Sequence, residues 1–399
     1  MPQLERIVLT YSFGQRPSGE SVHTTQLAGS FVHMGLDVAV CVVEEGEVSQ
    51  RLRGIGAEVI VGGRSALSRG NRRAGPSFLS KWLLPQGCAA WRDQITQLLG
   101  EHGAVVLFDT APSLLLWRKH IGKPAAPFVL HWKATSIRRS PFGPLAARAA
   151  DAVVSPSPRA LASIRPWARG KPVCLALQSI SREAATAVSL FSQNAELGDL
   201  PPGDDREVVL LHGGGTLPGK RVWAAVQATV RLRHMELPVR LVVAGPTDGA
   251  AADKILRSVP PEHRGAVHFV GWTDSIHELM LHSNIFVHTS HHEGISNVLL
   301  EAVAAGLPVV ATDVGDTGTI VRHGENGYLV PPGNRGLAVR VANALEPLVR
   351  ERSLRVAFGH RGQELIRLQH RPGLQAERLR DFIEERLLPL SSLSRQAVE

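Results

Sequence analysis

Residues 283–312 read SNIFVHTSHHEGISNVLLEAVAAGLPVVAT, and this stretch predicts how the rest of the chain is organised. Its apolar residues 285–287 indicate a strand, residues 297–305 a short helix, and residues 309–311 a second buried strand. Gly306 follows the helix, where a left-handed residue commonly ends it. The pattern predicts a βαβ unit whose helix begins at the carboxyl end of a strand, which is where open α/β sheets bind ligands.

The turn before this helix predicts an anion site between two carboxylates. Glu293 precedes the helix and Glu301 lies on it, while Gly294 lets a ligand approach the backbone closely. Ser296 is expected to cap the helix with its side chain. Free amides and the positive helix end favour a phosphate here; the amides are those of Ile295, Ser296 and Asn297. The alternative is two ordinary surface glutamates beside a βαβ turn.

A chain of 399 residues is too long for one growing core, so two domains are expected. Strands alternate with helices on both sides of a polar segment, residues 193–206 (QNAELGDLPPGDDR), which resembles a linker. We predict an α/β fold of two Rossmann-like doubly wound domains, residues 1–195 and 206–373, facing each other across a cleft. The C-terminal helix, about residues 374–399, is expected to pack back on the first domain.

Composition limits the class of protein further. No apolar run reaches the length of a membrane span, and the first residues lack the apolar core of a signal peptide. Cys41, Cys88 and Cys174 are far apart and match no metal or disulfide spacing, which favours a reducing, cytoplasmic location.

Positive charge is concentrated in the first domain. Residues 64–171 contain 17 basic and 4 acidic residues, whereas residues 201–399 contain 22 of each. Within this segment, basic residues at 64, 69, 72, 73 and 81 alternate with apolar and aromatic ones at 78 and 82–84. Such a surface suggests an anionic membrane, with the protein peripheral on its inner face, or an anionic acceptor. No nucleic-acid recognition module is present, so a nucleic-acid partner is not expected.

A glycine-rich segment, GGTLPGK at residues 214–220, satisfies the spacing of a P-loop. Arg221 stands where a P-loop needs Ser or Thr to hold Mg²⁺. A P-loop NTPase therefore remains an alternative. The simpler expectation is a glycine turn, with Gly214 and Gly215, that presents Lys220 and its neighbour Arg221 to a phosphate.

Histidines raise the question of a metal. His288, His291 and His292 precede Glu293, but their spacing matches no metal motif of known mechanism, and the chain has no Asp-x-Asp pair. We expect no metal and no cofactor. Asp109 and His131 each follow a predicted strand of the first domain, and His131 is either a buried structural imidazole or a ligand to a bound sugar.

Together these segments resemble the GT-B retaining glycosyltransferases of family 4. The segment from Glu293 to Glu301 is similar to their E-x7-E signature. LHGGGTLPGK resembles the family's phosphate loop, and HGENGYLVPPGN, FVGWTDSIHELMLHSNIFVHTS, PFVLHWK and RAADAVVSPSP resemble further family segments.

The resemblance implies that residues 206–373 bind a nucleotide-sugar donor and residues 1–195 a glycan or lipid-linked acceptor. Glu293 and His131 would contact the donor sugar, and Glu301 the ribose. Gly271 and Trp272 would lie near the base. Lys220 and the amides of residues 295–297 would hold the diphosphate without metal, and Gly19 and Asp109 would lie on the acceptor side.

Three positions depart from the family pattern. The phosphate-binding arginine five residues before the lysine is Gly215, the first-domain Gly-Gly pair is Ser18-Gly19, and a glutamate is replaced by Thr319. The hypothesis is a metal-independent retaining transferase that moves a sugar from a UDP-sugar to a lipid-linked or cell-envelope glycan. The alternatives are an inert GT-B-like partner of an active transferase and, behind it, the P-loop NTPase.

Overall fold

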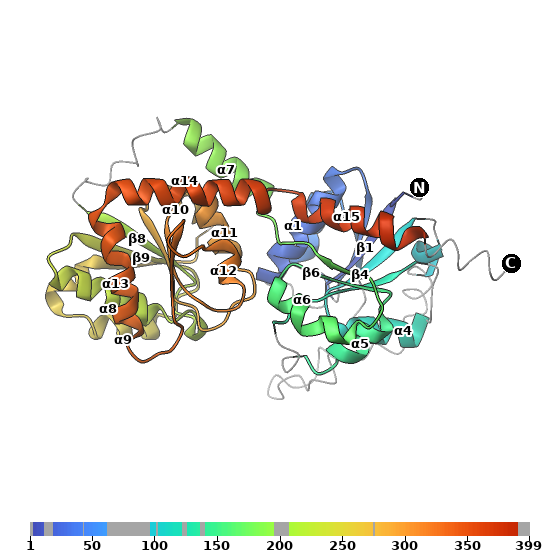
Figure 1. The fold of residues 1–399 in the computed structure, drawn as a ribbon, viewed down its shortest axis with the longest axis horizontal. Helices are drawn as coiled ribbons and strands as arrows, with labels where there is room; N and C mark the ends of the chain where they lie inside the picture. The colour runs from blue at the N-terminus through green and yellow to red at the C-terminus, as the bar shows by residue number, and fades with distance from the viewer. Residues whose placement is uncertain are drawn as a thin grey trace. The chain divides into compact units, whose positions relative to one another are not determined.

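The computed structural model describes residues 3–11, 19–42, 44–61, 96–100, 103–121, 126–135, 140–194, 207–273 and 276–389. The chain forms two compact units, one of residues 1–179 with 373–399 and the other of residues 180–372 (Figure 1). None of the helices in these described ranges has the length and apolar character needed to cross a bilayer.

The first unit contains a seven-stranded parallel sheet in the order β3-β2-β1-β4-β5-β6-β7. Its strands are β1 Arg6–Tyr11, β2 Asp37–Val42, β3 Glu58–Val61, β4 Ala104–Phe108, β5 Phe128–His131, β6 Ala152–Ser155 and β7 Val173–Leu175. Its helices are α1 Gly19–His33, α2 Glu47–Gly54, α4 Ala111–Ile121, α5 Gly143–Ala149, α6 Pro158–Ile164, the 3-10 turn η2 Arg165–Trp167, and α15 Leu374–Arg386. The strand order reverses between β1 and β4.

The second unit contains a six-stranded parallel sheet in the order β10-β9-β8-β11-β12-β13. Its strands are β8 Val208–Gly213, β9 Val239–Ala244, β10 Val267–Gly271, β11 Ile285–His288, β12 Val309–Thr312 and β13 Gly327–Val330. Its helices are α7 Arg182–Asn194, α8 Val222–His234, α9 Gly249–Arg257, α10 Ile276–Leu281, α11 Asn297–Ala304, α12 Thr317–Ile320, α13 Leu337–Arg350 and α14 Arg352–Gln369, with 3-10 turns η3 Pro218–Lys220 and η4 Pro261–Ala266. Here the order reverses between β8 and β11, and ligands of open α/β sheets bind at such a switch point.

Burial explains why these segments form strands. β4, β5, β6, β8, β11 and β12 are buried along their whole length, because helices cover both faces of a parallel sheet. In the second unit, Val287 and Val310 join one apolar cluster, while Phe286 and Val309 join the cluster on the opposite face. The predicted α/β class, with two Rossmann-like units, is confirmed.

The unit boundary differs from the predicted segment around residues 193–206. Helix α7, which we placed in the first domain, contacts α10 and α11 of the second unit. The C-terminal helix α15 contacts α1 and inserts Ala376, Leu379 and Ile383 into a core of the first unit. The predicted linker from residue 195 to 206, the basic segment around residues 64–92, Cys88 and Ser18 lie outside the described residues.

Candidate functional site

The short helix α11 begins directly beside the switch point of the second sheet. Its N-cap residue is Ser296, but the Ser296 side chain makes no capping hydrogen bond, so that prediction was wrong. Gly306 has the predicted left-handed backbone, with a φ of +82°. Within the described part of the chain, the amides of Ile295 and Ser296 have no hydrogen-bond partner. A Cβ added to Gly294 would meet nothing within 4 Å, so this end of α11 is open to a ligand.

Glu293 lies at the centre of a cluster of donors. Its Oε1 accepts from Ser290 Oγ at 2.7 Å, forms an ion pair with Lys220 Nζ, and lies 3.3 Å from Nε2 of His288. Oε2 has no partner among the described residues. Burial favours the neutral acid, but His288 and then Lys220 outweigh it and hold the pKa of Glu293 far below its usual range. Glu293 is therefore ionised, with one oxygen held and the other available.

Two buried histidines lie behind this cluster at the ends of adjacent strands. His288 ends β11 and is fully buried, and His212 lies near the end of β8, hydrogen-bonded to Thr289 at 3.1 Å. Burial, with a smaller contribution from His288, lowers the pKa of His212 to about 3. The sequence favours an ordinary loop histidine over a metal ligand at position 288, whereas the structure places His288 at the buried end of a strand. No cluster of three or more potential metal ligands occurs in the described ranges.

Arg221 donates its guanidinium hydrogen bonds to oxygen atoms of the protein. Its guanidinium is buried and donates to the carbonyl oxygens of Thr289 at 2.8 Å, Ser290 at 2.6 Å and Pro332 at 2.6 Å. It also donates to Asn334 Oδ1 at 2.9 Å. The expectation that the glycine turn presents Arg221 to a phosphate is therefore not supported, because these bonds hold its guanidinium against the loop after β11.

The glycine-rich turn after β8 packs backbone against backbone. Gly214 and Gly215 both donate to the carbonyl of Ala244 at 2.8 Å, and Thr216 donates to that of Pro246 at 3.0 Å. A P-loop needs such amides for phosphate, so this geometry differs from a P-loop. Gly215 has a φ of +57°, and an added Cβ would overlap the carbonyl of Pro246. An arginine could not occupy this position without moving the turn.

The remaining predicted donor residues lie on elements around the same strand ends. Gly271 ends β10 with a φ of +76°, and its carbonyl accepts from Gly245 at 2.8 Å. Trp272 follows it with 62% of its surface exposed. Glu301 lies on α11, and its Oε2 is 3.5 Å from Nε2 of His277. The structure thus brings Lys220 and Glu293 into direct contact, whereas Glu301 pairs with a different residue.

The predicted residues of the first unit form a separate group of their own. His131 ends β5 and is buried; its Nε2 has no hydrogen-bond partner in the part of the chain that is described. The His131 ring centroid is 5.3 Å from that of His23, which bonds to Gln375 of α15 at 3.1 Å. Burial, then Lys133, lowers the pKa of both histidines, that of His23 to about 4. His23 was not predicted, because nothing in its sequence context marks its burial.

Gly19 and Asp109 are the two predicted acceptor-side residues. Asp109 follows β4, one of the two strands between which the order of the first sheet reverses, and Gly19 begins the helix that follows the other, β1. Asp109 follows β4 and accepts from Thr10 Oγ1 of the adjacent strand β1 at 2.7 Å. Gly19 is the first residue of α1, and a Cβ added there would meet nothing within 4 Å. Next to it, Glu20 pairs with Lys133 at 2.6 Å. Their contact with an acceptor stays a prediction.

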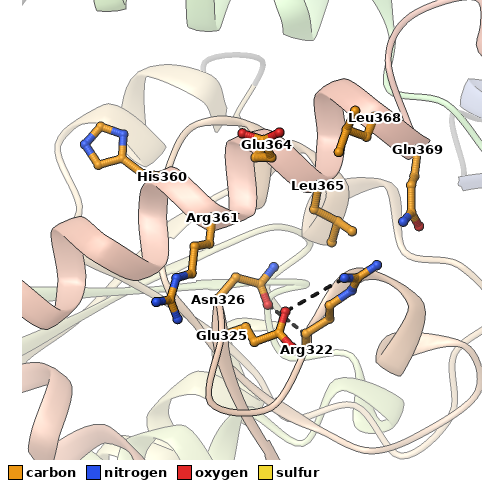
Figure 2. A pocket seen from close by; sticks show the side chains of 9 residues that line it. All are labelled: Arg322, Glu325, Asn326, His360, Arg361, Glu364, Leu365, Leu368 and Gln369. Atoms are coloured by element: carbon orange, nitrogen blue, oxygen red, sulfur yellow. Dashed lines mark hydrogen bonds and ion pairs between the residues drawn. The ribbon is translucent and has the colours of Figure 1, made fainter.

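A cavity of about 310 Å³ lies elsewhere in the second unit (Figure 2). It is lined by Arg322, Glu325, Asn326, His360, Arg361, Glu364, Leu365, Leu368 and Gln369, none of which we predicted as a site residue. Figure 2 shows Arg322 joined to Glu325 and, on α14, Arg361 and Glu364 beside the apolar Leu365 and Leu368. Arg322 and Glu325 form an ion pair of 3.8 Å. This mixed lining favours no particular class of ligand.

Comparison with known proteins identifies what the second unit is similar to. Residues 206–350 match the family model described as glycosyl transferases group 1. N-acetyl-alpha-D-glucosaminyl L-malate synthase of Bacillus anthracis is 32% identical over 168 residues, 42% of each chain. The lipopolysaccharide core biosynthesis glycosyltransferase LpsE of Rhizobium meliloti is 38% identical over 102 residues, 26% of this chain and 29% of LpsE. The aligned part thus spans less than half of either relative.

Solved structures match the whole chain. HepE of Anabaena, crystallised with UDP, superposes with a TM-score of 0.72 at 17% identity, covering 96% of this chain and 100% of HepE. WaaG, a glycosyltransferase involved in lipopolysaccharide biosynthesis, gives a TM-score of 0.62 at 16% identity, covering 94% and 99%. At these identities the likeness shows the fold.

Proposed function

We propose that this chain, a GT-B protein whose residues 206–350 match the glycosyl transferases group 1 family, transfers a sugar from a nucleotide-diphosphate sugar to a glycan acceptor. The observation that carries the proposal is the ion pair of Lys220 with Glu293 at the open end of α11. It combines a cation for a diphosphate, free amides for its oxygens and an ionised carboxylate for sugar hydroxyls. UDP is the nucleotide we favour, because HepE was crystallised with it.

In this proposal the second unit holds the donor. Lys220 and the amides of Ile295 and Ser296 bind the diphosphate, and Oε2 of Glu293 accepts from a hydroxyl of the transferred sugar. Glu301 binds the ribose, and Trp272, which is largely exposed, covers the base. Lysine and amides neutralise the phosphates, so the proposed reaction is metal-independent.

The chemistry we propose is transfer with retention of configuration. The bond between the sugar C1 and the β-phosphate oxygen breaks as the acceptor oxygen bonds to C1 on the same face. The acceptor proton passes to an oxygen of the departing β-phosphate. No protein nucleophile is required, and the protein contributes by stabilising the charge that develops on the leaving diphosphate. In this proposal Lys220 supplies positive charge to the leaving diphosphate.

Nucleotide release tests this function. We would incubate the protein with a panel of UDP- and GDP-sugars and a lipid-linked glycan acceptor, with and without EDTA. We expect release with one donor, unaffected by EDTA and abolished in Glu293→Ala. Binding of a nucleotide without any turnover would favour an inert partner subunit. The absence of both nucleotide binding and nucleotide release would refute the proposal.

The acceptor we propose is lipid-linked or part of the cell envelope, at the inner face of the cytoplasmic membrane. The support is a basic surface on α5, α6, η2 and the turn after η2, where Arg148, Arg159, Arg165 and Arg169 are exposed and Leu145 is 55% exposed. The single acidic residue between residues 140 and 182 is Asp151, which pairs with Arg118 at 2.6 Å. Anionic lipid attracts such a surface.

Vesicle sedimentation tests the membrane proposal. We expect binding to vesicles containing phosphatidylglycerol that weakens as salt is raised, and no binding to phosphatidylcholine alone. The double variant Arg165→Glu/Arg169→Glu should bind about tenfold more weakly or worse, since each basic residue near the surface contributes about 1 kcal/mol. Binding that is indifferent to lipid charge would contradict the proposal.

A further inference from the structure

His288 is a buried imidazole that the proposed chemistry does not yet use. Its side chain is fully buried at the end of β11, and within the described residues its Nδ1 has no hydrogen-bond partner. Nε2 lies 3.3 Å from Oε1 of Glu293, within ion-pair distance. Buried polar groups without partners are rare in native proteins, and one placed beside a buried carboxylate requires an explanation.

The partners of Glu293 divide into one that can leave and two that cannot. Lys220 is on a long flexible side chain that is 25% exposed, and the proposed function assigns it to the diphosphate. His288 is the last residue of strand β11, and Ser290 follows it by two residues in the loop after that strand. Both side chains are therefore expected to stay in place when a ligand binds. Glu293 itself is only 13% exposed. A buried carboxylate that loses its cation tends to take up a proton, because burial penalises the charged form.

We infer that His288 is a positioning residue that keeps Glu293 oriented and ionised after Lys220 has turned to the donor diphosphate. Lys220 and His288 contact the same oxygen, Oε1, so His288 can hold the carboxylate without covering Oε2. In the free protein Lys220 and His288 share Oε1, and in the donor complex the imidazole N–H remains. The sugar then meets a fixed carboxylate rather than a protonated or rotated acid.

The groups around the pair support this assignment. Among the described residues, Lys220 and His288 are the charged or titratable groups that act on Glu293, and Ser290 Oγ donates to it. His212, on the neighbouring strand β8, is hydrogen-bonded to Thr289 and not to Glu293. His212 is therefore a matched control: a histidine equally buried at a strand end that does not contact the carboxylate.

Kinetics test the inference, which rests on the proposed function. His288→Leu should lower kcat about tenfold or more, with the donor KM and the calorimetric Kd for UDP changed less than about twofold, because the nucleotide contacts remain. His288→Gln places an amide N–H where Nε2 lies and should restore most of kcat. In a Glu293→Gln background, His288→Leu should cause no further loss. His212→Leu should leave the ratio of kcat to KM unchanged apart from any loss of folded protein.

A second measurement needs no activity. Lys220→Met mimics the state in which the lysine has left, and ¹³C NMR of glutamate-labelled protein, assigned with Glu293→Gln, follows the ionisation of Glu293. We expect Glu293 to stay ionised in Lys220→Met and to titrate at higher pH once His288→Leu is added. Unchanged ionisation in the double variant would overturn the inference. A parallel loss of kcat, UDP affinity and thermal stability in His288→Leu and His212→Leu would also overturn the inference. A wild-type protein without turnover would refute only the proposed function.

Discussion

Gly215 gives the sharpest test of how the turn after β8 is built. Gly215→Ala places a Cβ on a residue with a φ of +57°, which costs about 1–2 kcal/mol for an L-residue. The same Cβ overlaps the backbone carbonyl of Pro246, and relieving such overlap costs about 1–3 kcal/mol more. The sum, about 2–5 kcal/mol, corresponds to a loss of roughly 4–20 °C in the midpoint of thermal unfolding for a unit of this size.

The matched control lies in the same turn. Gly219 has no positive φ, and a Cβ added to it would meet nothing within 4 Å, so Gly219→Ala should leave the melting temperature unchanged. Differential scanning calorimetry of both variants, with the wild type, measures the difference. If Gly215→Ala melted with the wild type, the close packing against Pro246 would be wrong. The absence of arginine at this position would then need another explanation.

Three further outcomes follow from the site. Arg221→Gln should destabilise the protein by about 3 kcal/mol or more in urea unfolding, because buried carbonyl oxygens lose a charged donor; a loss of UDP affinity without a loss of stability would instead make it a ligand contact. Gly294→Ala should unfold like the wild type but bind UDP at least tenfold more weakly by calorimetry, because its Cβ enters space left for the ligand; equal affinity would remove Gly294 from the site. His212 has a pKa of about 3 in the fold and about 6.5 in the unfolded chain, so only the unfolded chain takes up a proton there as pH falls below about 6.5. The free energy of unfolding should therefore fall, by about 2 kcal/mol at about pH 5. A His212→Gln variant with the same pH slope in urea titrations would contradict this.

The sequence predicted the fold well because parallel strands leave a strong signal. The apolar runs at 104–108 and 285–287 are short, branched and bounded by turn residues, and both are buried strands at the centre of their sheets. The boundary was harder, because α7 is followed by a polar segment that resembles a linker. Its apolar face packs on α10 and α11, and that contact is not visible in local composition.

The site was predicted in part, for a physical reason. Lys220 and Glu293 belong to loops at the switch point, and the prediction named them separately without their ion pair. Arg221 was misread because a basic residue beside a glycine turn looks free to bind phosphate, whereas its partners come from segments about 70 and 110 residues later. For His288 the sequence favoured an ordinary loop histidine over a metal ligand, and its contact with Glu293 was missed because that distance depends on how the chain turns after β11.

In the proposed function, the end of α11, with Lys220 and Glu293, binds the diphosphate of a nucleotide. Isothermal titration of UDP into the wild type, Lys220→Met and Gly219→Ala at low salt measures this most directly. We predict saturable binding to the wild type and Gly219→Ala, weakened about tenfold or more in Lys220→Met, since a charged contact contributes about 1.5–3 kcal/mol. Equal affinity of all three proteins for UDP would contradict the account.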